Sequence, residues 1–268
     1  MAEDCRFFIG NQTVFSAPIA EPFAFAIEHR FEAFEFFPDG GPGGRGWSAQ
    51  DVVGADRARF RDVAREHHLR LSVHAALEAH LLDPSSWGSL VRDIELARDL
   101  GAKVLNLHID DGDAVGCAEA VRSLMKTLRP AGIALALENT VTAGPDYVNQ
   151  LFERLYDLEG RLDDVGLCLD IGHANLFSKT HNDYLGYLDR LADHVPIVHG
   201  HIHENWGDGD RHLTLFTGPS AKDPSGVVGL LRRLQRRGFR GSLILEQWPN
   251  PPSLLVTARD RLQAMQRG

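Results

Sequence analysis

Short apolar runs of this sequence end in His, Glu or Asp, the residue types that bind metals and move protons. They span residues 69–74, 104–108, 133–138, 165–170, 196–201 and 243–246, and they end at His74, His108, Glu138, Asp170, His201 and Glu246. Each run has the length and apolar content of a buried strand, and all but the last precede loop residues and then a helical pattern. The polar residues are therefore expected where strands meet their loops.

The carboxylates in this set need partners. Glu138 and Glu246 would be costly to bury at strand ends alone, and several carboxylates around one cavity raise one another's pKa unless a cation neutralises them. Imidazole mixed with carboxylate suits Zn, Mn, Co or Fe better than Ca, and Mg prefers fewer nitrogens. The sequence therefore predicts a site for a divalent metal, with Zn, Mn or Mg as the candidates and room for one to three ions.

Two further pairs have ligand spacing. Asp170 and His173 lie three residues apart at a strand-to-loop turn and could serve one metal or two neighbouring ones. Asp210 and His212 share one side of an extended segment, because residues two apart face the same way. A single histidine at a strand end is more often a hydrogen-bonded structural residue than a ligand, so the prediction depends on the whole set.

Three histidines alternate along one predicted strand, and their roles have to be distinguished. His201 is the preferred ligand and His203 the second choice. His199 is interpreted as a residue of the barrel interior held by a hydrogen bond, since buried polar groups are generally satisfied internally.

The elements that must position these residues alternate between strand and helix. The expected strands are residues 6–10, 31–37, 69–74, 103–109, 133–138, 165–170, 196–203 and 242–247, and the expected helices are 20–29, 51–68, 86–100, 114–129, 146–158, 182–194, 226–237 and 253–265. Such alternation implies parallel pairing with crossovers, and eight units imply closure into a barrel. The prediction is a single (β/α)8 TIM barrel over residues 1–268, in which the carboxyl ends of the strands share one mouth.

Three segments stand out between these elements. Residues 39–46 are glycine-rich and are expected to form a rim loop; no helix start follows immediately, which argues against a phosphate cradle. Residues 204–225 are long for a barrel connection, as functional lids and binding loops are, and carry Asp210 and His212. The aromatic-rich run 31–37 is interpreted as core packing.

Composition limits the partners. The formal net charge of -9 leaves no basic footprint for nucleic acid, which argues against that partner without excluding it. Cys5, Cys117 and Cys168 are odd in number and scattered, which favours a reducing compartment, so a cytoplasmic location is expected. The first ten residues have no signal-like apolar stretch, and no apolar run approaches the roughly 20 residues that cross a bilayer.

At these residues the chain resembles the xylose isomerase-like TIM-barrel superfamily, which includes the endonuclease IV type of apurinic-site nuclease and many sugar or sugar-phosphate isomerases and epimerases. The matching stretches are Ser72-Val73-His74-Ala75, Asn106-Leu107-His108, Leu137-Glu138-Asn139, residues 166–173, His201-Ile202-His203-Glu204-Asn205, Asp210-Arg211-His212 and Leu245-Glu246. After the Asp-x-His element the superfamily usually has a Gly-x-Gly turn, whereas this chain has Phe216-Thr217-Gly218. The path of this loop, and with it the reach of Asp210 and His212, is left open.

The resemblance implies two sets of roles. In the isomerase and epimerase branch, residues matching Glu138, Asp170, His201 and Glu246 hold one divalent metal, the two glutamates move protons on the substrate's carbon, and His173 contacts a substrate oxygen. In the endonuclease branch three zinc ions are held, with Glu138 bridging two, by the residues matching His74, His108, Glu138, Asp170, His173, His201, Asp210, His212 and Glu246. All of these residue types are present.

The prediction that follows is a metal-dependent isomerase or epimerase of a small sugar or sugar phosphate, with Glu138, Glu246 and His173 as its catalytic residues. An endonuclease IV-like multi-zinc phosphodiesterase is the alternative, and a sugar-binding barrel without catalysis is the third hypothesis. Barrels of this group are often dimers or tetramers, so a homo-oligomer is the assembly to test.

Overall fold

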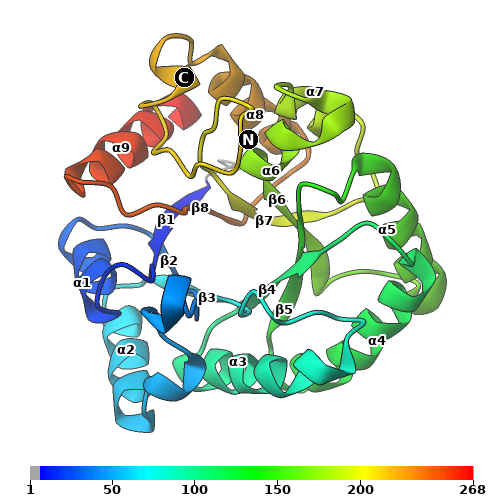
Figure 1. Cartoon of the computed structure of the whole chain (residues 1–268), viewed down its shortest axis with the longest axis horizontal. Helices are drawn as coiled ribbons and strands as arrows, with labels where there is room; N and C mark the ends of the chain where they lie inside the picture. Colours follow the sequence, from blue (N-terminus) through cyan, green and yellow to red (C-terminus); the bar gives the residue numbers. More distant parts are fainter. Residues whose placement is uncertain (1–6, 268) are drawn as a thin grey trace, which may run out of the picture.

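Eight parallel strands form the centre of the protein. The computed structural model describes residues 7–267, so Cys5 and Arg6 of the sequence analysis, and most of the segment examined for a signal, lie outside it. The strands pair in chain order, and β1 closes on β8. Figure 1 looks along this barrel, with the strands inside and the helices around them. The predicted (β/α)8 fold is confirmed.

The strands are β1 (Phe8–Gln12), β2 (Ala33–Phe36), β3 (Arg70–His74), β4 (Val104–Ile109), β5 (Ala134–Asn139), β6 (Val165–Asp170), β7 (Ile197–His201) and β8 (Ser242–Leu245). The helices are α1 (Ala20–Glu28), α2 (Gly54–Glu66), α3 (Trp87–Leu100), α4 (Ala114–Ala131), α5 (Pro145–Glu159), α6 (Ile171–Leu176), α7 (Tyr184–Asp189), α8 (Ser225–Arg236) and α9 (Ser253–Arg267). Five short 3-10 turns lie in the described loops, at Pro42–Gly44, Ala49–Asp51, Pro84–Ser86, Ser178–Thr180 and Pro219–Ala221.

The predicted helix 182–194 is wrong in extent. Two short helices, α6 and α7, connect β6 to β7 instead. The α6 helix starts directly at the strand end because the carboxylate of Asp170 accepts the backbone N–H of His173, at 2.7 Å, as an N-cap. Asp183 caps α7 in the same way by accepting the N–H of Gly186 at 2.8 Å. The early α6 turn matters for the site because it carries His173.

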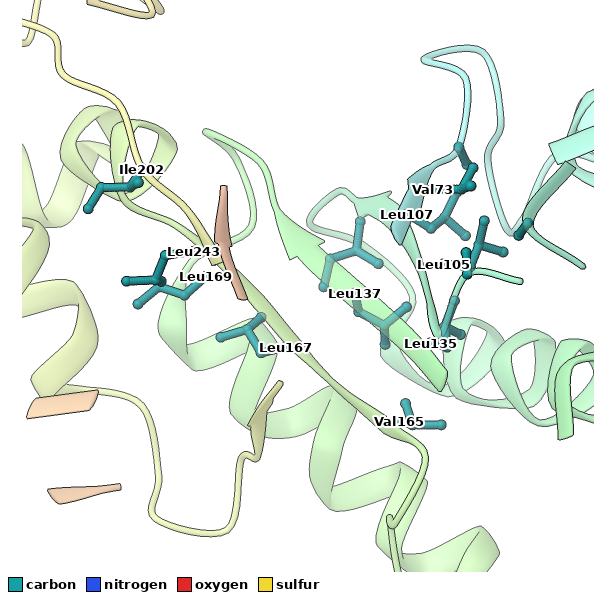
Figure 2. Close-up of a cluster of buried hydrophobic side chains, with 14 of the residues drawn as sticks. Val73, Leu105, Leu107, Leu135, Leu137, Val165, Leu167, Leu169, Ile202 and Leu243 are labelled. Atoms are coloured by element: carbon teal, nitrogen blue, oxygen red, sulfur yellow. The ribbon is translucent and has the colours of Figure 1, made fainter. Parts of the chain in front are cut away.

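Alternation along the strands separates the packing face from the barrel interior. Leu105, Leu107, Leu135 and Leu137 of β4 and β5 are fully or almost fully buried and gather in one apolar cluster with residues of β6 (Figure 2). The residues between them point the other way, because successive strand side chains face opposite sides. The register pairs His108 with Glu138 on that inner side.

Loops at the carboxyl ends of the strands form the rim. The long β7–α8 connection is tied back on itself by an antiparallel bridge between Glu204 and Leu213. The carboxylate of Glu204 accepts the backbone N–H groups of Gly218, at 3.1 Å, and Ser220, at 2.7 Å. The buried carboxylate of Glu204, at the start of this loop, therefore holds the segment near its end. Within residues 7–267, no helix has the length and apolar content required to cross a membrane.

Candidate metal centre and active site

Glu138 lies at the centre of the polar cluster. Its carboxylate oxygens are 3.2 Å from Nε2 of His74, 3.1 Å from Nε2 of His108 and 3.1 Å from Nδ1 of His201. The amide of Asn106 also donates a hydrogen bond to this carboxylate, a contact that the sequence analysis did not predict. Strand ends far apart in the sequence are thus brought to one carboxylate.

Asn139 and Asp170 are linked across the β5–β6 boundary. The Asn139 side chain exchanges two hydrogen bonds of 3.0 Å with the backbone of Asp170, one as donor and one as acceptor. The carbonyl oxygen of Asn139 also lies 2.9 Å from Nδ1 of His173. These contacts fix the strand-to-helix turn that presents Asp170 and His173 together.

Asp210 and His212 reach the cluster from the β7–α8 loop. Oδ2 of Asp210 is 3.0 Å from Nε2 of His212 and 3.3 Å from Nε2 of His173. His212 adopts a left-handed backbone conformation with φ of 45°. The loop with Phe216 in place of the usual first glycine therefore still brings both side chains to the other candidate ligands.

The alternating histidines of β7 occupy three different environments. His201 lies between the two glutamates, with Nδ1 3.1 Å from Glu138 and 3.1 Å from Glu246. His203 lies beyond the strand end, with Nε2 3.2 Å from Asp170, and its ring stacks on His212 with centroids 4.0 Å apart. His199 is buried deeper in the barrel and is held by a hydrogen bond, as predicted.

Glu35 is a second residue beside the cluster that the sequence analysis did not predict. It is fully buried and accepts hydrogen bonds of 2.8 Å from Nε2 of His199 and 2.8 Å from Nε2 of His201. The aromatic-rich run was interpreted as core packing, which is right for Phe34 and Phe36. Because Glu35 lies between them, alternation directs its side chain into the barrel, and this was the available signal.

In four histidines, one ring nitrogen lies within hydrogen-bond distance of a carbonyl or carboxylate oxygen, which acts as the acceptor. Nδ1 of His74 faces the carbonyl of Ala75 at 2.6 Å, and Nδ1 of His212 faces the carbonyl of Glu246 at 3.2 Å. Nδ1 of His173 and Nε2 of His201 are held by Asn139 and Glu35 as described. Each contact favours a proton on the nitrogen that faces this acceptor, so the other nitrogen, which faces the cluster, is the one available to a cation. Metal-binding histidines are typically oriented in this way.

The carboxylates differ in their electrostatics. Burial raises the pKa of Glu246 well above its usual range. At Glu138 the same burial is outweighed by the charges of His201 and His108, which hold the pKa of that carboxyl well below its usual range. Burial also opposes protonation of His212, yet the hydrogen bond to Asp210 and the nearby acidic groups raise its pKa to about 9. The cluster therefore needs positive charge, whether from protons or from bound cations.

The residues fit a divalent cation. His201 Nδ1 and Glu246 Oε2 are buried without a hydrogen-bond partner among the described residues. Sets of three side chains have ligand atoms within 4.8 Å of one another; they include His74–His108–Glu138, Glu138–Asp170–His201, His74–His201–Glu246 and His203–Asp210–His212. A mixed nitrogen and oxygen donor set of this kind suits zinc and related ions.

A cavity of about 590 Å³ opens above the cluster. Its lining includes seven of the predicted site residues, His74, His108, Glu138, His173, Asp210, His212 and Glu246. Asp170 and His201 belong to the cluster but lie on its side away from the cavity and do not line it. The volume is in the usual range for a small-molecule site, roughly 300–1,000 Å³.

The fold and this site define a (β/α)8 barrel with a polar centre at the carboxyl ends of its strands. The chain belongs to the xylose isomerase-like TIM barrel family, whose model matches residues 23–265. Family resemblance and fold, expected from the sequence, are therefore confirmed.

Two relatives illustrate the breadth of the sequence comparison. A probable endonuclease 4 of Nitrosopumilus maritimus is 25% identical over 244 residues, which cover 78% of this chain and 84% of the relative. The uncharacterized protein y4fM of Sinorhizobium fredii is 31% identical over 137 residues, 47% of this chain and 42% of its own length, so less than half of that protein is matched.

Solved structures with the same fold come from both branches. A D-tagatose 3-epimerase-like protein superposes with a TM-score of 0.73 at 18% identity, covering 97% of each chain. Endonuclease IV from Thermus thermophilus superposes with a TM-score of 0.64 at 24% identity, covering 97% of this chain and 99% of its own. The IOLI protein, solved with a zinc atom, gives a TM-score of 0.66 at 15% identity, covering 97% and 98%. These likenesses establish the fold, and the reaction has to be argued from the site.

Proposed function

We propose that this protein is a divalent-metal-dependent isomerase or epimerase that acts on a hydroxy-carbonyl compound of the sugar class. One observation carries the proposal. Of the side chains at Glu138, Asp170, His201 and Glu246, the two glutamates line the cavity while the other two stay behind it. Both glutamates lie 3.1 Å from the same nitrogen of His201. Two carboxylates at one centre, both lining the cavity, can remove a proton from a substrate carbon and return one to it.

The chain's own residues have separate tasks in this reaction. Glu138, Asp170, His201 and Glu246 would hold the ion, which supplies Lewis-acid polarisation of a substrate oxygen when bound. One glutamate removes the proton from the carbon next to the carbonyl, and the other returns a proton to that carbon or its neighbour. His173 opens onto the same cavity and would contact a substrate oxygen.

Exchange of carbon-bound hydrogen with solvent tests this chemistry directly. Metal-loaded protein is incubated in D2O with panels of ketoses, aldoses and sugar phosphates, and deuterium next to the carbonyl is measured by NMR. Deuterium uptake is expected with at least one compound, and Glu138→Gln and Glu246→Gln should each abolish it. Near-normal turnover by Glu138→Gln on an identified substrate would show that the proton-transfer assignment is wrong.

Phosphoester hydrolysis by a multi-metal centre is the second candidate, and the position of Asp210 favours it. Its carboxylate contacts both His173 and His212, within 3.3 Å, so a further group of ligand atoms lies beside the four-residue set. Metal ions held there would activate water for attack on a phosphoester. Three tightly held zinc ions per chain, together with cleavage of an abasic oligonucleotide or an activated phosphodiester, would favour hydrolysis. One exchangeable ion with deuterium uptake would favour isomerisation.

A further inference from the structure

The cavity above the candidate metal centre has a second, chemically different wall. Apolar side chains line it, including Val14, Phe15, Phe37, Leu77, Trp248 and Leu254. Four of them follow β1, β2 and β3, and the other two follow β8, so they come from neighbouring strands of the closed barrel (Figure 1). The described loops after β1 and β2 contribute none of the predicted metal ligands. The sector of the mouth that adjoins the candidate ligands therefore holds most of the large apolar side chains, beside the smaller polar contribution of Gln12, Thr13, Ser16 and Asp39.

The apolar wall begins directly at a candidate ligand. The ring of Phe37 packs on the imidazole of His74 with centroids 4.2 Å apart. Trp248 is braced edge-on by Phe25, with centroids 5.3 Å apart and planes at 83°. A compound bound through an oxygen at the polar cluster would therefore extend along fixed aromatic surface.

The outer part of the wall is exposed to solvent. Phe15 is 38% exposed and Leu77 is 50% exposed, although both line the cavity. The glycine-rich segment closes over Phe15 at Gly41, which has φ of 61° and lies so near that a Cβ there would be 2.8 Å from Phe15 Cβ. Large exposed apolar groups at a cavity mouth indicate contact with an apolar ligand.

The charge of the cavity lining limits the class of ligand further. Among the described residues that line this cavity there is no Lys or Arg, whereas Asp39, Glu138, Asp210 and Glu246 are present. A phosphate group on the far end of a sugar would lie away from the ligand cluster, beside apolar side chains and Asp39, with no side-chain cation to pair with it. Enzymes that bind phosphate usually provide Arg, Lys or helix N-termini for it.

We infer that the substrate is an unphosphorylated hydroxy-carbonyl compound with an apolar substituent, such as an aryl or alkyl group, that lies on Phe15, Phe37, Leu77 and Trp248. The inference rests on the proposed function for the polar end of the substrate. The apolar end follows from the cavity wall alone.

Hydroxamates test the inference without turnover, because they bind metal through two oxygens and their tails can be varied. Zinc-loaded full-length protein is titrated calorimetrically with acetohydroxamate, benzohydroxamate and phosphoglycolohydroxamate. Benzohydroxamate is expected to bind roughly 10- to 100-fold more tightly than acetohydroxamate, the gain from burying one aromatic ring. Phosphoglycolohydroxamate should have no advantage over acetohydroxamate.

Substitutions at the exposed end of the apolar wall test whether the tighter binding of benzohydroxamate arises there. Phe15→Ser and Leu77→Ser should each remove much of the benzohydroxamate advantage and leave acetohydroxamate affinity unchanged. Leu82→Ser is the matched control, because Leu82 is 54% exposed but does not line this cavity. It should change neither affinity.

Several results would overturn the inference: a protein that takes up no zinc, no binding by either plain hydroxamate, tightest binding by the phosphorylated probe, or an aryl preference that survives both substitutions. Failure of the proposed reaction gives a different pattern. In that case the aryl preference and its loss in the variants remain, while deuterium uptake is absent with every compound of the panel and with aryl and alkyl hydroxy-ketones.

Discussion

Glu35 accepts a hydrogen bond from Nε2 of His201 at 2.8 Å, and this contact points Nδ1 of His201 at Glu138 and Glu246. Neither residue of the contact lines the cavity. Glu35 therefore orients an imidazole of the proposed metal centre, as carboxylates behind metal-binding histidines generally do.

Glu35→Gln should weaken metal binding. An amide can accept only through its oxygen, so it cannot hold the protons of both His199 and His201 as the carboxylate does. The expected loss in zinc affinity is roughly 10- to 100-fold, measured by competition with a chromophoric chelator.

Glu28→Gln is the control for that measurement, because Glu28 is an exposed residue of the nearby α1 helix. It should keep the affinity of the unaltered chain. Equal zinc affinity in the Glu35→Gln variant would contradict a positioning role for Glu35.

Phe216 is expected to store backbone strain. It adopts a left-handed conformation with φ of 68°, a region of backbone geometry that favours glycine. Its side chain is nearly buried, and the guanidinium of Arg261 lies 3.7 Å from its ring centroid. Phe216→Gly and Phe216→Ala should both destabilise the fold, since losing a buried aromatic ring costs about 3–5 kcal/mol.

The order of the two Phe216 variants is the informative result. Glycine should be more stable than alanine by about 1 kcal/mol, because alanine retains the left-handed strain. At Leu215, which is buried beside it and has no positive φ, the order should be reversed by the usual flexibility of glycine. Urea unfolding of the four variants measures both differences, and the same order at both positions would exclude strain at Phe216.

The sequence predicted which side chains converge at the barrel mouth far better than it predicted the residues that hold them in place. Strand ends such as His74, Glu138 and Asp170 could be placed because barrel geometry directs them to one mouth. Glu35 was hidden in an aromatic strand, and the contact of Asn106 with Glu138 depends on the register of β4 against β5. Register and ring orientation arise from packing of the whole barrel, which local patterns do not encode. The short α6 helix was missed because one side-chain cap at Asp170 starts it.

Asp93 should make stability depend on pH. Burial in α3 raises the pKa of its carboxyl to about 7, although the backbone N–H of Ala76 donates to it at 2.9 Å. The folded chain therefore binds a proton more tightly than the unfolded chain, so the free energy of unfolding falls as pH rises from about 4 to about 7. Asp93→Asn removes this dependence while its amide oxygen can still accept from Ala76.

The free energy of unfolding of the Asp93→Asn variant is compared with that of the unaltered chain at each pH. This difference should be about 2–4 kcal/mol more favourable to the variant at pH 8 than at pH 4, from the size of the pKa shift. Urea unfolding at both pH values, with chelator present throughout, measures it. Glu95→Gln, an exposed position of the same helix, should preserve the pH dependence of the unaltered chain. A pH dependence that is identical in the Asp93→Asn protein would contradict the buried-acid explanation.

Metal removal should destabilise the chain through the same carboxylates that form the centre. Glu138, Asp170 and Glu246 are buried together, and without a cation their mutual repulsion is relieved by protons on nearby histidines and on Glu246 itself. A ligand bound only by the folded state adds about 2.7 kcal/mol at a concentration of 100 times its Kd. For a chain of this size, zinc added to chelator-treated protein should therefore raise Tm by roughly 5–10 °C, measured by calorimetry. Calcium, which prefers oxygen ligands alone, should produce a much smaller rise, and equal effects of the two ions would argue against a histidine-containing site.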